Sequence, residues 1–223
     1  MKKICLLLAC LLLSVAVWAQ KTKVVINTEY GKIVMMLYDK TPKHRDNMVK
    51  LIKEKFYDGT LFHRVIPGFV IQGGDPDSKN PQKNQPGAPL GEGDVGYRIP
   101  AEINDEYFHQ RGAVGMARDG NPEKASSGCQ FYIVTGKKFT DADLDKAEQR
   151  SGHKIPPAQR EVYKTVGGVP HLDGGYTVFG MVTEGMDVVE KIANEPRNAA
   201  DRPNKDIKMI SVRIVKKKRF LFF

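Results

Sequence analysis

Short apolar runs, interrupted by glycine, proline and asparagine, recur along the chain from residue 23 onward. Runs rich in valine, isoleucine and tyrosine are typical of β-strands. They predict strands at residues 23–26, 32–38, 60–66, 69–72, 97–99, 113–116, 130–134, 177–182 and 207–215. Helical spacing follows Thr41-Pro42, where we expect the threonine to cap a helix and the proline to begin it, and recurs over residues 186–193. The pattern predicts a mainly β fold with a helix near each end, and by itself it does not separate a closed antiparallel barrel from a sandwich.

Residues 140–166 depart from this rhythm, because they are charged and rich in lysine, glutamate, glutamine and alanine. Gly152 and the pair Pro156-Pro157 divide them, which predicts two short helices. A segment of this length is too short to bury a core of its own. We therefore expect a short helical insertion that lies on the main domain, and not a second domain.

The N-terminus has the features of a secretory signal peptide over residues 1–19. Two lysines precede an apolar run that reaches Ala19, and the side chains at positions 17 and 19 favour cleavage before Gln20. Cleavage there leaves residues 20–223 as one domain. We expect the protein to be exported, with the bacterial periplasm as its location.

Two other interpretations of the N-terminus stay open. The first is a retained membrane anchor, which needs roughly 20 apolar residues. This apolar run is at that limit, and no stop-transfer cluster follows it. We therefore expect no stable membrane insertion after cleavage. The stretch Leu-Leu-Ala-Cys that ends at Cys10 is similar to a lipoprotein processing site. A lipid anchor on Cys10 is therefore the minor alternative.

The composition is that of a soluble globular domain. The 223 residues are 41% hydrophobic and 27% charged, which argues against a disordered chain and a multi-pass membrane protein. The formal net charge is +9, but the positive residues are dispersed except at 216–219. No recognised nucleic-acid reading motif is present, so we expect no nucleic-acid partner, and we expect a monomer.

Cysteines and histidines give no sign of a disulfide or a metal site. Loss of Cys5 and Cys10 with the signal peptide leaves Cys129 alone, so the mature domain has no intramolecular disulfide, and we expect Cys129 to be a packed small residue. The histidines lack the paired spacing of a zinc site, which favours structural or solvent-facing roles for His63, His109, His153 and His171.

Specific motifs begin at Phe62-His63-Arg64-Val65-Ile66, which continues through Phe69 to Gln72-Gly73-Gly74-Asp75. Further blocks are Gly115-Met116-Ala117, Gln130-Phe131-Tyr132-Ile133, and Leu172-Asp173 leading into Val178-Phe179-Gly180. In this order and spacing they resemble the cyclophilin-type peptidyl-prolyl cis/trans isomerases over residues 24–215, apart from 140–166. The resemblance implies a closed eight-stranded antiparallel β-barrel capped by two α-helices. It also implies a proline site on an outer face of the barrel.

The chemistry of such an isomerase needs no nucleophile, metal or cofactor. An Xaa-Pro bond isomerises over a barrier of about 18 to 20 kcal/mol because rotation breaks amide resonance. The twisted amide has a pyramidal and basic prolyl nitrogen, so a fixed cation beside it stabilises the transition state more than the planar ground state. Arg64 suits this role, because its guanidinium stays charged and offers a rigid fork of donors. We therefore expect Arg64 to be catalytic, with an ion-pair partner on the sheet as the alternative.

The resemblance also implies a substrate-binding surface. Strand alternation places Val70 with Gln72 on one face, and Gln130 with Tyr132 likewise. The implied proline pocket is Phe69, Val70, Tyr132 and Leu172, the implied peptide groove is Gln72, Ala117, Arg118 and Gln130, and His63 and Tyr176 match positions near the rim.

Three positions depart from the family pattern. His171 stands where many members have tryptophan, so tight cyclosporin binding is not expected. Arg118 replaces a common asparagine whose contact is made by the backbone, and Cys129 replaces a small residue after a longer connection.

The sequence thus predicts an isomerase that acts on Xaa-Pro bonds of exported polypeptides and speeds their folding. Its partners are proline-containing segments of unfolded or partly folded proteins, whose uncatalysed isomerisation takes tens of seconds. The alternative is a proline-peptide-binding chaperone module with little dependence on turnover. Arg64 favours the enzyme, since a pure binder has less need of it.

Overall fold

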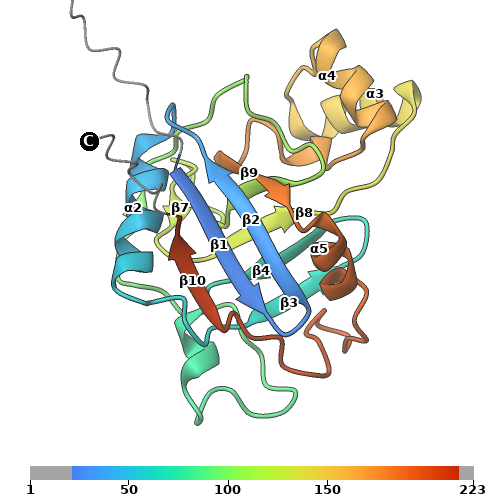
Figure 1. Ribbon diagram of the computed structural model, residues 1–223. Helices are drawn as coiled ribbons and strands as arrows, with labels where there is room; N and C mark the ends of the chain where they lie inside the picture. The colour runs from blue at the N-terminus through green and yellow to red at the C-terminus, as the bar shows by residue number, and fades with distance from the viewer. Residues whose placement is uncertain (1–21, 216–223) are drawn as a thin grey trace, which may run out of the picture.

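A computed structural model gives the fold of residues 22–215 (Figure 1). The predicted signal peptide at 1–19, with Cys10 in it, and the basic cluster at 216–219 lie outside the described residues. Within the described range no helix is long and apolar enough to cross a membrane.

Among residues 22–215 eight strands form one antiparallel sheet, which confirms the mainly β prediction. Their order across the sheet is β10-β1-β2-β9-β6-β8-β4-β3. In chain order their bounds are β1 (Thr22–Thr28), β2 (Gly31–Leu37), β3 (Phe62–Ile66), β4 (Val70–Gly73), β6 (Ala113–Met116), β8 (Phe131–Val134), β9 (Val178–Glu184) and β10 (Ser211–Ile214). Two further short strands, β5 (Arg98–Ile99) and β7 (Ser126–Ser127), pair only with each other. The apolar pattern predicts β5 and misses β7, which has the sequence Ser-Ser.

The inner face of the curled sheet encloses the main core. Side chains alternate along β1 and β2, so that Ile26 pairs with Ile33 and Val24 pairs with Met35, all four fully buried. The outer face beside β4, β6 and β8 carries a second, smaller apolar cluster that includes Val70, Tyr132, Val134 and Val178. The sheet therefore supports an apolar surface on its outside as well as its inside.

The closed barrel that the sequence predicts is only partly present. The described strands form a strongly curled half-barrel, and no ladder joins its edge strands β10 and β3. The segment before β10 instead hydrogen-bonds to the start of β3 and the residues before it. The amide of Phe62 donates to the carbonyl of Ile207, and the amide of Met209 donates to the carbonyl of Thr60. These bonds tie the two edges together at one end, where the chain runs as irregular backbone.

The described part of the chain has four α-helices, where the resemblance implies two. The predicted terminal helices are α2 (Pro42–Lys53) and α5 (Met186–Ala193), which lie on opposite sides of the curled sheet in Figure 1. The two short helices predicted in 140–166 are α3 (Asp141–Ser151) and α4 (Pro157–Thr165), set away from the sheet. Short 3₁₀ turns η1 (Pro76–Lys79) and η2 (Pro170–Leu172) complete the structure.

The start of α2 differs from the prediction in one respect. Thr41 occupies the N-cap position, but its hydroxyl donates to the carbonyl of Tyr38 and makes no cap bond to the helix. The carboxylate of Glu102 accepts hydrogen bonds from the Lys43 and His44 amides instead, at 3.1 and 3.0 Å. The cap therefore comes from a residue distant in sequence.

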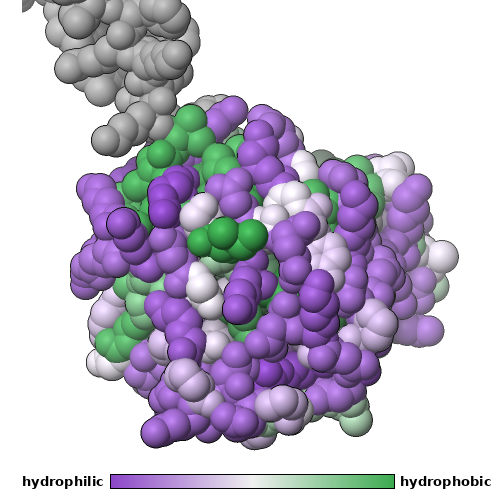
Figure 2. Space-filling view, turned by 60° about the horizontal axis from the view of Figure 1, so that its bottom comes forward, coloured by the Kyte–Doolittle hydropathy of each residue, from purple (hydrophilic) through white to green (hydrophobic). Residues whose placement is uncertain are grey.

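Exposed apolar side chains are few and scattered in the described part of the chain. The large ones are Tyr97, Val166, Ile210 and Val215. The face in Figure 2 is mainly hydrophilic, with apolar residues in small separate areas. Dispersed apolar residues of this kind are ordinary for a protein surface.

Candidate active site

Two adjoining hollows lie on the outer face of the sheet and bring together almost all of the residues predicted from the sequence. The first, of about 140 Å³, is lined by Arg64, Phe69, Val70, Gln72, Ala117, Arg118, Tyr132, Leu172 and Tyr176. The second, of about 760 Å³, adjoins it through Gln72, Ala117 and Arg118, and it adds Gln130 and the backbone of residues 91–98. The predicted proline pocket and peptide groove therefore form one continuous surface.

A shift in strand register places Arg64 on this surface. Phe62 and Val65 are three residues apart yet both point into the core, which strict alternation along a strand forbids. The register with β4 shifts between Phe62 and Arg64, so the extra residue of a β-bulge turns Arg64 outward.

The guanidinium of Arg64 is loosely held. Its Nη1 lies 3.4 Å from Oε1 of Gln72, and its Nε lies 3.8 Å from Oδ2 of Asp201. The two charged side chains remain 39% and 32% exposed, so the ion pair contributes little to stability. The guanidinium also lies 5.8 Å from the ring centre of Phe69, beside the first hollow. Its charge therefore faces the apolar pocket without being committed to a buried partner.

A chain of amides fixes the groove next to Arg64. Nε2 of Gln72 donates to Oε1 of Gln130 at 3.2 Å, and Nε2 of Gln130 donates to the carbonyls of Gly91 and Gly93, both at 2.8 Å. The predicted strand alternation holds, because Val70, Gln72 and Tyr132 line the first hollow and Gln130 lines the second. The orientation of both glutamines is thus set by the loop at 91–93.

Aromatic rings form the walls of the first hollow. The ring of Tyr132 lies directly over Gly115, its partner on β6, where a Cβ atom would come within 2.4 Å of the ring. Only glycine allows this approach, which explains the glycine in the Gly115-Met116-Ala117 block. On the other side His171 stacks on Phe69, with ring centres 5.7 Å apart and planes within 8°. Burial lowers the pKa of His171, which favours the uncharged ring in this stack.

Arg118 braces the rim of the pocket. Its Nε donates to the Gly175 carbonyl at 2.7 Å, and its Nη1 donates to the carbonyls of Asp119 and Asn121. Its guanidinium lies 4.9 Å from the ring centre of Tyr176, within the range of a cation–π contact. The side chain that replaces the common asparagine thus joins two loops on either side of the hollow.

His63 does not lie at the rim, which corrects its predicted place. Its side chain is 4% exposed and borders Gly91, and neither ring nitrogen has a hydrogen-bond partner in the described part of the chain. Burial lowers its pKa to about 4. Direct contact between His63 and a peptide is therefore not supported by this geometry.

Three residues behind the pocket escaped the sequence prediction of the site. His109 lies between the Tyr132 hydroxyl and the Asp173 carboxylate, and Tyr163 of α4 reaches the same carboxylate. Asp173 belongs to the Leu172-Asp173 motif, so a sequence signal exists at that position alone. His109 and Tyr163 are distant in sequence, and nothing in their spacing indicates the contact.

The remaining predictions on chemistry concern metals and Cys129. Over residues 22–215 there is no cluster of histidine, cysteine and carboxylate side chains suited to a metal ion. Cys129 is fully buried in the main core, as predicted, and burial raises its pKa to about 12. A thiol in that state is a poor nucleophile.

Comparison with known proteins agrees with this geometry. The family model of the cyclophilin type peptidyl-prolyl cis-trans isomerases matches residues 23–214. A peptidyl-prolyl cis-trans isomerase of Acinetobacter baylyi is 34% identical over 220 residues, which are 96% of this chain and 96% of that protein. A Streptococcus pyogenes protein named as a bifunctional phosphatase/peptidyl-prolyl cis-trans isomerase is 37% identical over 83% of this chain, which spans only 37% of that protein.

Solved structures give the same result. A cyclophilin type peptidyl-prolyl cis-trans isomerase of Cryptosporidium parvum superposes with a TM-score of 0.65 at 25% identity, covering 88% of this chain and 98% of that one. A second structure of that protein, determined in the presence of the dipeptide Ala-Pro, has a TM-score of 0.61 at 25% identity and covers 87% and 99% of the two chains.

Proposed function

The chain belongs to the cyclophilin-type peptidyl-prolyl cis-trans isomerases, and from this premise we propose that it isomerises Xaa-Pro bonds of exported polypeptides through Arg64. The observation that carries the proposal is the position of the Arg64 guanidinium, which lines a hollow together with Phe69 and Leu172 and keeps only weak contacts of its own. No metal or cofactor takes part, because rotation about the amide requires charge stabilisation alone.

The hollow suits a proline ring. Its volume of about 140 Å³ is close to the roughly 150 Å³ in which an engineered apolar cavity holds benzene. A proline ring seated against Phe69, Tyr132 and Leu172 brings its nitrogen to the side of the hollow that Arg64 lines. The presence of Ala-Pro with the Cryptosporidium parvum relative supports proline peptides as the partners.

Arg64 then acts on the reacting amide itself. Twisting the C–N bond localises a lone pair on the prolyl nitrogen, and the guanidinium donates to that nitrogen more strongly than to the planar amide. The groove formed by Gln72, Gln130 and the backbone at Ala117 and Arg118 holds the flanking peptide by hydrogen bonds, so the twist is confined to one bond.

The cellular setting is part of the same proposal. The apolar run at 1–19 supports export to the periplasm after cleavage before Gln20, with lipid attachment at Cys10 as the minor alternative. The scattered exposed apolar residues support a monomer. We extend the proposal to barrel closure, which is supported by the hydrogen bonds between residues 207–209 and 59–62.

Exchange NMR on a short Xaa-Pro peptide tests the role of Arg64. We expect Arg64→Ala to fold normally and to lose about 100-fold or more in turnover, because removal of one donor that stabilises transition-state charge costs this much in other enzymes. We expect the variant to keep part of its peptide affinity.

Arg197→Ala provides the matched control. Arg197 also pairs with Asp201, with Nε 3.1 Å from Oδ1, but it lines neither hollow. We expect this variant to turn over peptide as the parent does. Equal turnover in the parent and Arg64→Ala would remove Arg64 from the mechanism, and a parent that binds peptide without turnover would favour the proline-peptide-binding chaperone.

A further inference from the structure

A buried network of four side chains connects the proline pocket to helix α4. The Tyr132 hydroxyl lies 2.8 Å from Nε2 of His109, and Nδ1 of His109 lies 2.7 Å from Oδ1 of Asp173. The Tyr163 hydroxyl donates to Oδ2 of the same carboxylate at 2.5 Å. Tyr132 lines the pocket, whereas Tyr163 belongs to the segment that follows α3.

The chemistry of the partners favours one direction for each hydrogen bond in this network. Carboxylate oxygens accept, so we assign the hydrogen between the two side chains to Nδ1 of His109, and the backbone amide of His109 donates to Oδ1 as well, at 2.9 Å. In a neutral imidazole Nε2 is then an acceptor, and it receives the Tyr132 hydroxyl proton. Burial raises the pKa of Tyr132 well above its ordinary value, so the hydroxyl keeps that proton. The His109 amide, His109 Nδ1 and the Tyr163 hydroxyl therefore all donate to Asp173, and the Tyr132 hydroxyl is linked to it through His109.

Water has almost no access to these four groups. Tyr163 and His109 are at most 1% exposed, and Tyr132 and Asp173 are at most 5% exposed. A buried polar group that loses its partner keeps its desolvation penalty, so each member depends on the next. We therefore expect the network to be rigid and to restrict the motion of the residues that contact Tyr132 and Tyr163.

Two walls of the pocket are attached to this network. The Tyr132 ring itself forms one wall. It packs against Gly115, and its hydroxyl is hydrogen-bonded to His109. Leu172 is a second wall, and it precedes Asp173 in the chain. One carboxylate thus anchors both sides of the space that receives the proline ring.

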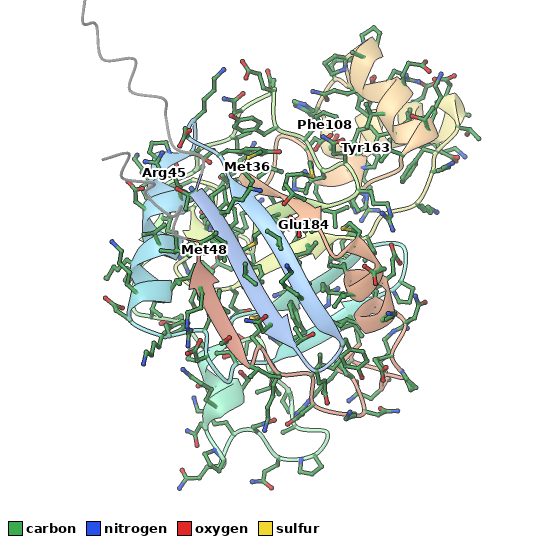
Figure 3. All side chains as sticks on the ribbon, in the orientation of Figure 1. Met36, Arg45, Met48, Phe108, Tyr163 and Glu184 are labelled. Carbon is green, nitrogen blue, oxygen red and sulfur yellow. The ribbon has the colours of Figure 1, made fainter. Side chains whose placement is uncertain are left out.

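The far end of the network is built into the helical segment. The Tyr163 ring packs edge to face on Phe108, with ring centres 5.4 Å apart, and on Phe139 at 6.3 Å (Figure 3). It belongs to an apolar cluster with Leu144 and Ala147 of α3. The position of Tyr163 is therefore set by the packing of α3 and α4.

We propose that His109, Asp173 and Tyr163 are positioning residues, which hold the Tyr132 and Leu172 walls at a fixed separation and so make α4 a determinant of affinity for the proline ring. The proposal rests on the proposed function of the pocket and adds to it residues that touch no substrate. It assigns a role in the reaction to the segment at 140–166.

Tyr163→Phe tests the proposal with the loss of one oxygen atom. The walls contact the ring equally in the ground and transition states, so weaker positioning removes uniform binding. We expect KM for an Xaa-Pro peptide, and its Kd from NMR titration, to rise about threefold to tenfold while kcat stays close to the parent value. Arg64→Ala has the opposite profile, with the loss in kcat.

Asp173→Asn gives a second and spectroscopic readout. We expect the imidazole nitrogens of His109 to show the single Nδ1–H tautomer in the parent. In this variant we expect a mixture of tautomers, because the asparagine amide can donate a hydrogen bond as well as accept one. We also expect a larger rise in KM than in Tyr163→Phe. Folding of both variants is checked by circular dichroism and thermal melting.

Tyr57→Phe is the matched control. Tyr57 is another buried tyrosine, and its hydroxyl donates to the Cys129 carbonyl at 3.0 Å in the main core, away from the network. We expect it to lower the melting temperature about as much as Tyr163→Phe, with KM and the His109 nitrogens as in the parent.

The outcomes separate the two proposals. Should Tyr163→Phe and Asp173→Asn change only thermal stability, with peptide affinity and the His109 spectrum of the parent, the network is merely structural and the inference is overturned. A parent that binds peptide but has no turnover overturns the proposed function alone, because titration and the His109 spectrum still measure the effect of the network.

Discussion

Arg64 and His63 are neighbours on β3, yet their side chains meet different surroundings. Arg64 borders the open hollow with weak contacts, whereas His63 is enclosed near Gly91 with Asp75, Arg64 and Arg202 as its charged neighbours. The motif around residue 64 is local and predicts the position of the arginine correctly. The burial of His63 depends on a loop some thirty residues later in the chain. A prediction from one strand has no access to that contact, which is why the expected rim position is wrong.

The buried imidazole leads to a prediction about acid stability. The pKa of His63 is about 4 in the folded protein because of burial, against an ordinary value of 6.5. Between these values the unfolded chain binds the extra proton, so the free energy of unfolding falls as pH drops from about 6.5 towards 4. The His63 contribution approaches about 3 kcal/mol at the lower end. We expect His63→Leu to match the parent near pH 7 and to lose less stability in acid, measured by urea unfolding across this range.

His153→Leu is the control for this experiment, because it removes a histidine from the less buried segment between α3 and α4. We expect its stability to follow the parent at every pH. The same slope of stability against pH in parent and His63→Leu would show that His63 is protonated in the folded state or reaches solvent.

Individual helices show which caps can be predicted from local sequence. At α3 the Thr140 hydroxyl accepts from the Asp143 amide, and the Asp143 carboxylate accepts from the Thr140 amide, so the complete capping box lies within four residues. At α2 the threonine-proline signal correctly predicts where the helix begins. Its amides, however, are capped by Glu102, fifty-eight residues after His44. The choice of a distant carboxylate over Thr41 depends on how the loop before β6 folds back.

Removal of the Glu102 charge should therefore weaken α2 selectively. The carboxylate accepts hydrogen bonds from two helix amides and from Nδ1 of His44, the last at 2.7 Å. Burial raises the pKa of Glu102, but the hydrogen bonds from the His44 side chain and amide hold that pKa below the ordinary value. Glu102→Gln keeps the shape and loses the charge at a helix N-terminus. We expect a loss of about 1 to 2 kcal/mol in the free energy of unfolding. Amide exchange over residues 42–46 should speed up more than elsewhere.

Glu106→Gln serves as the comparison, because Glu106 makes an exposed ion pair with Lys40 and caps no helix. We expect it to change stability by less than about 0.5 kcal/mol. If Glu102→Gln costs no more than Glu106→Gln, the carboxylate has no capping role.

For the whole molecule, periodicity and resemblance supply different parts of the prediction. Alternation predicts that β1 and β10 are strands. It does not predict that Val24 pairs with Ile214, which is far from it in the sequence. The strand order follows from the family resemblance, since many orders satisfy the same pattern. The apolar alternation at 207–215 predicts a strand, but not that residues 207–209 lie outside β10 and hydrogen-bond to residues 59–62 at the other edge of the sheet. The pocket could be predicted because its residues lie in motifs, whereas its link to α4 comes from the tertiary contact of Tyr163.

Cys129 reports on opening of the whole structure. It lies in the main core among residues of both sheet edges and the helices α2 and α5, and none of its surface is exposed. Burial also raises its pKa to about 12, which removes the reactive thiolate. Its Sγ lies 4.0 Å from the Gly93 carbonyl, and we expect the loop at 91–93 to stay closed over it while the core is folded. A reagent therefore meets this thiol only when the core as a whole opens.

We expect a thiol reagent to label Cys129 in native buffer at a rate set by global unfolding, in a chain that carries Cys5→Ser and Cys10→Ser. The logarithm of that rate should rise linearly with urea, with the slope of equilibrium unfolding, because both processes expose the same surface. Lys154→Cys on this background is the positive control, since Lys154 is 92% exposed, and it should react at once. Labelling of Cys129 that is fast or independent of urea would mean that the core admits solvent locally. The hydrogen bonds of residues 207–209 between the two sheet edges would then be too weak to make the domain one cooperative unit.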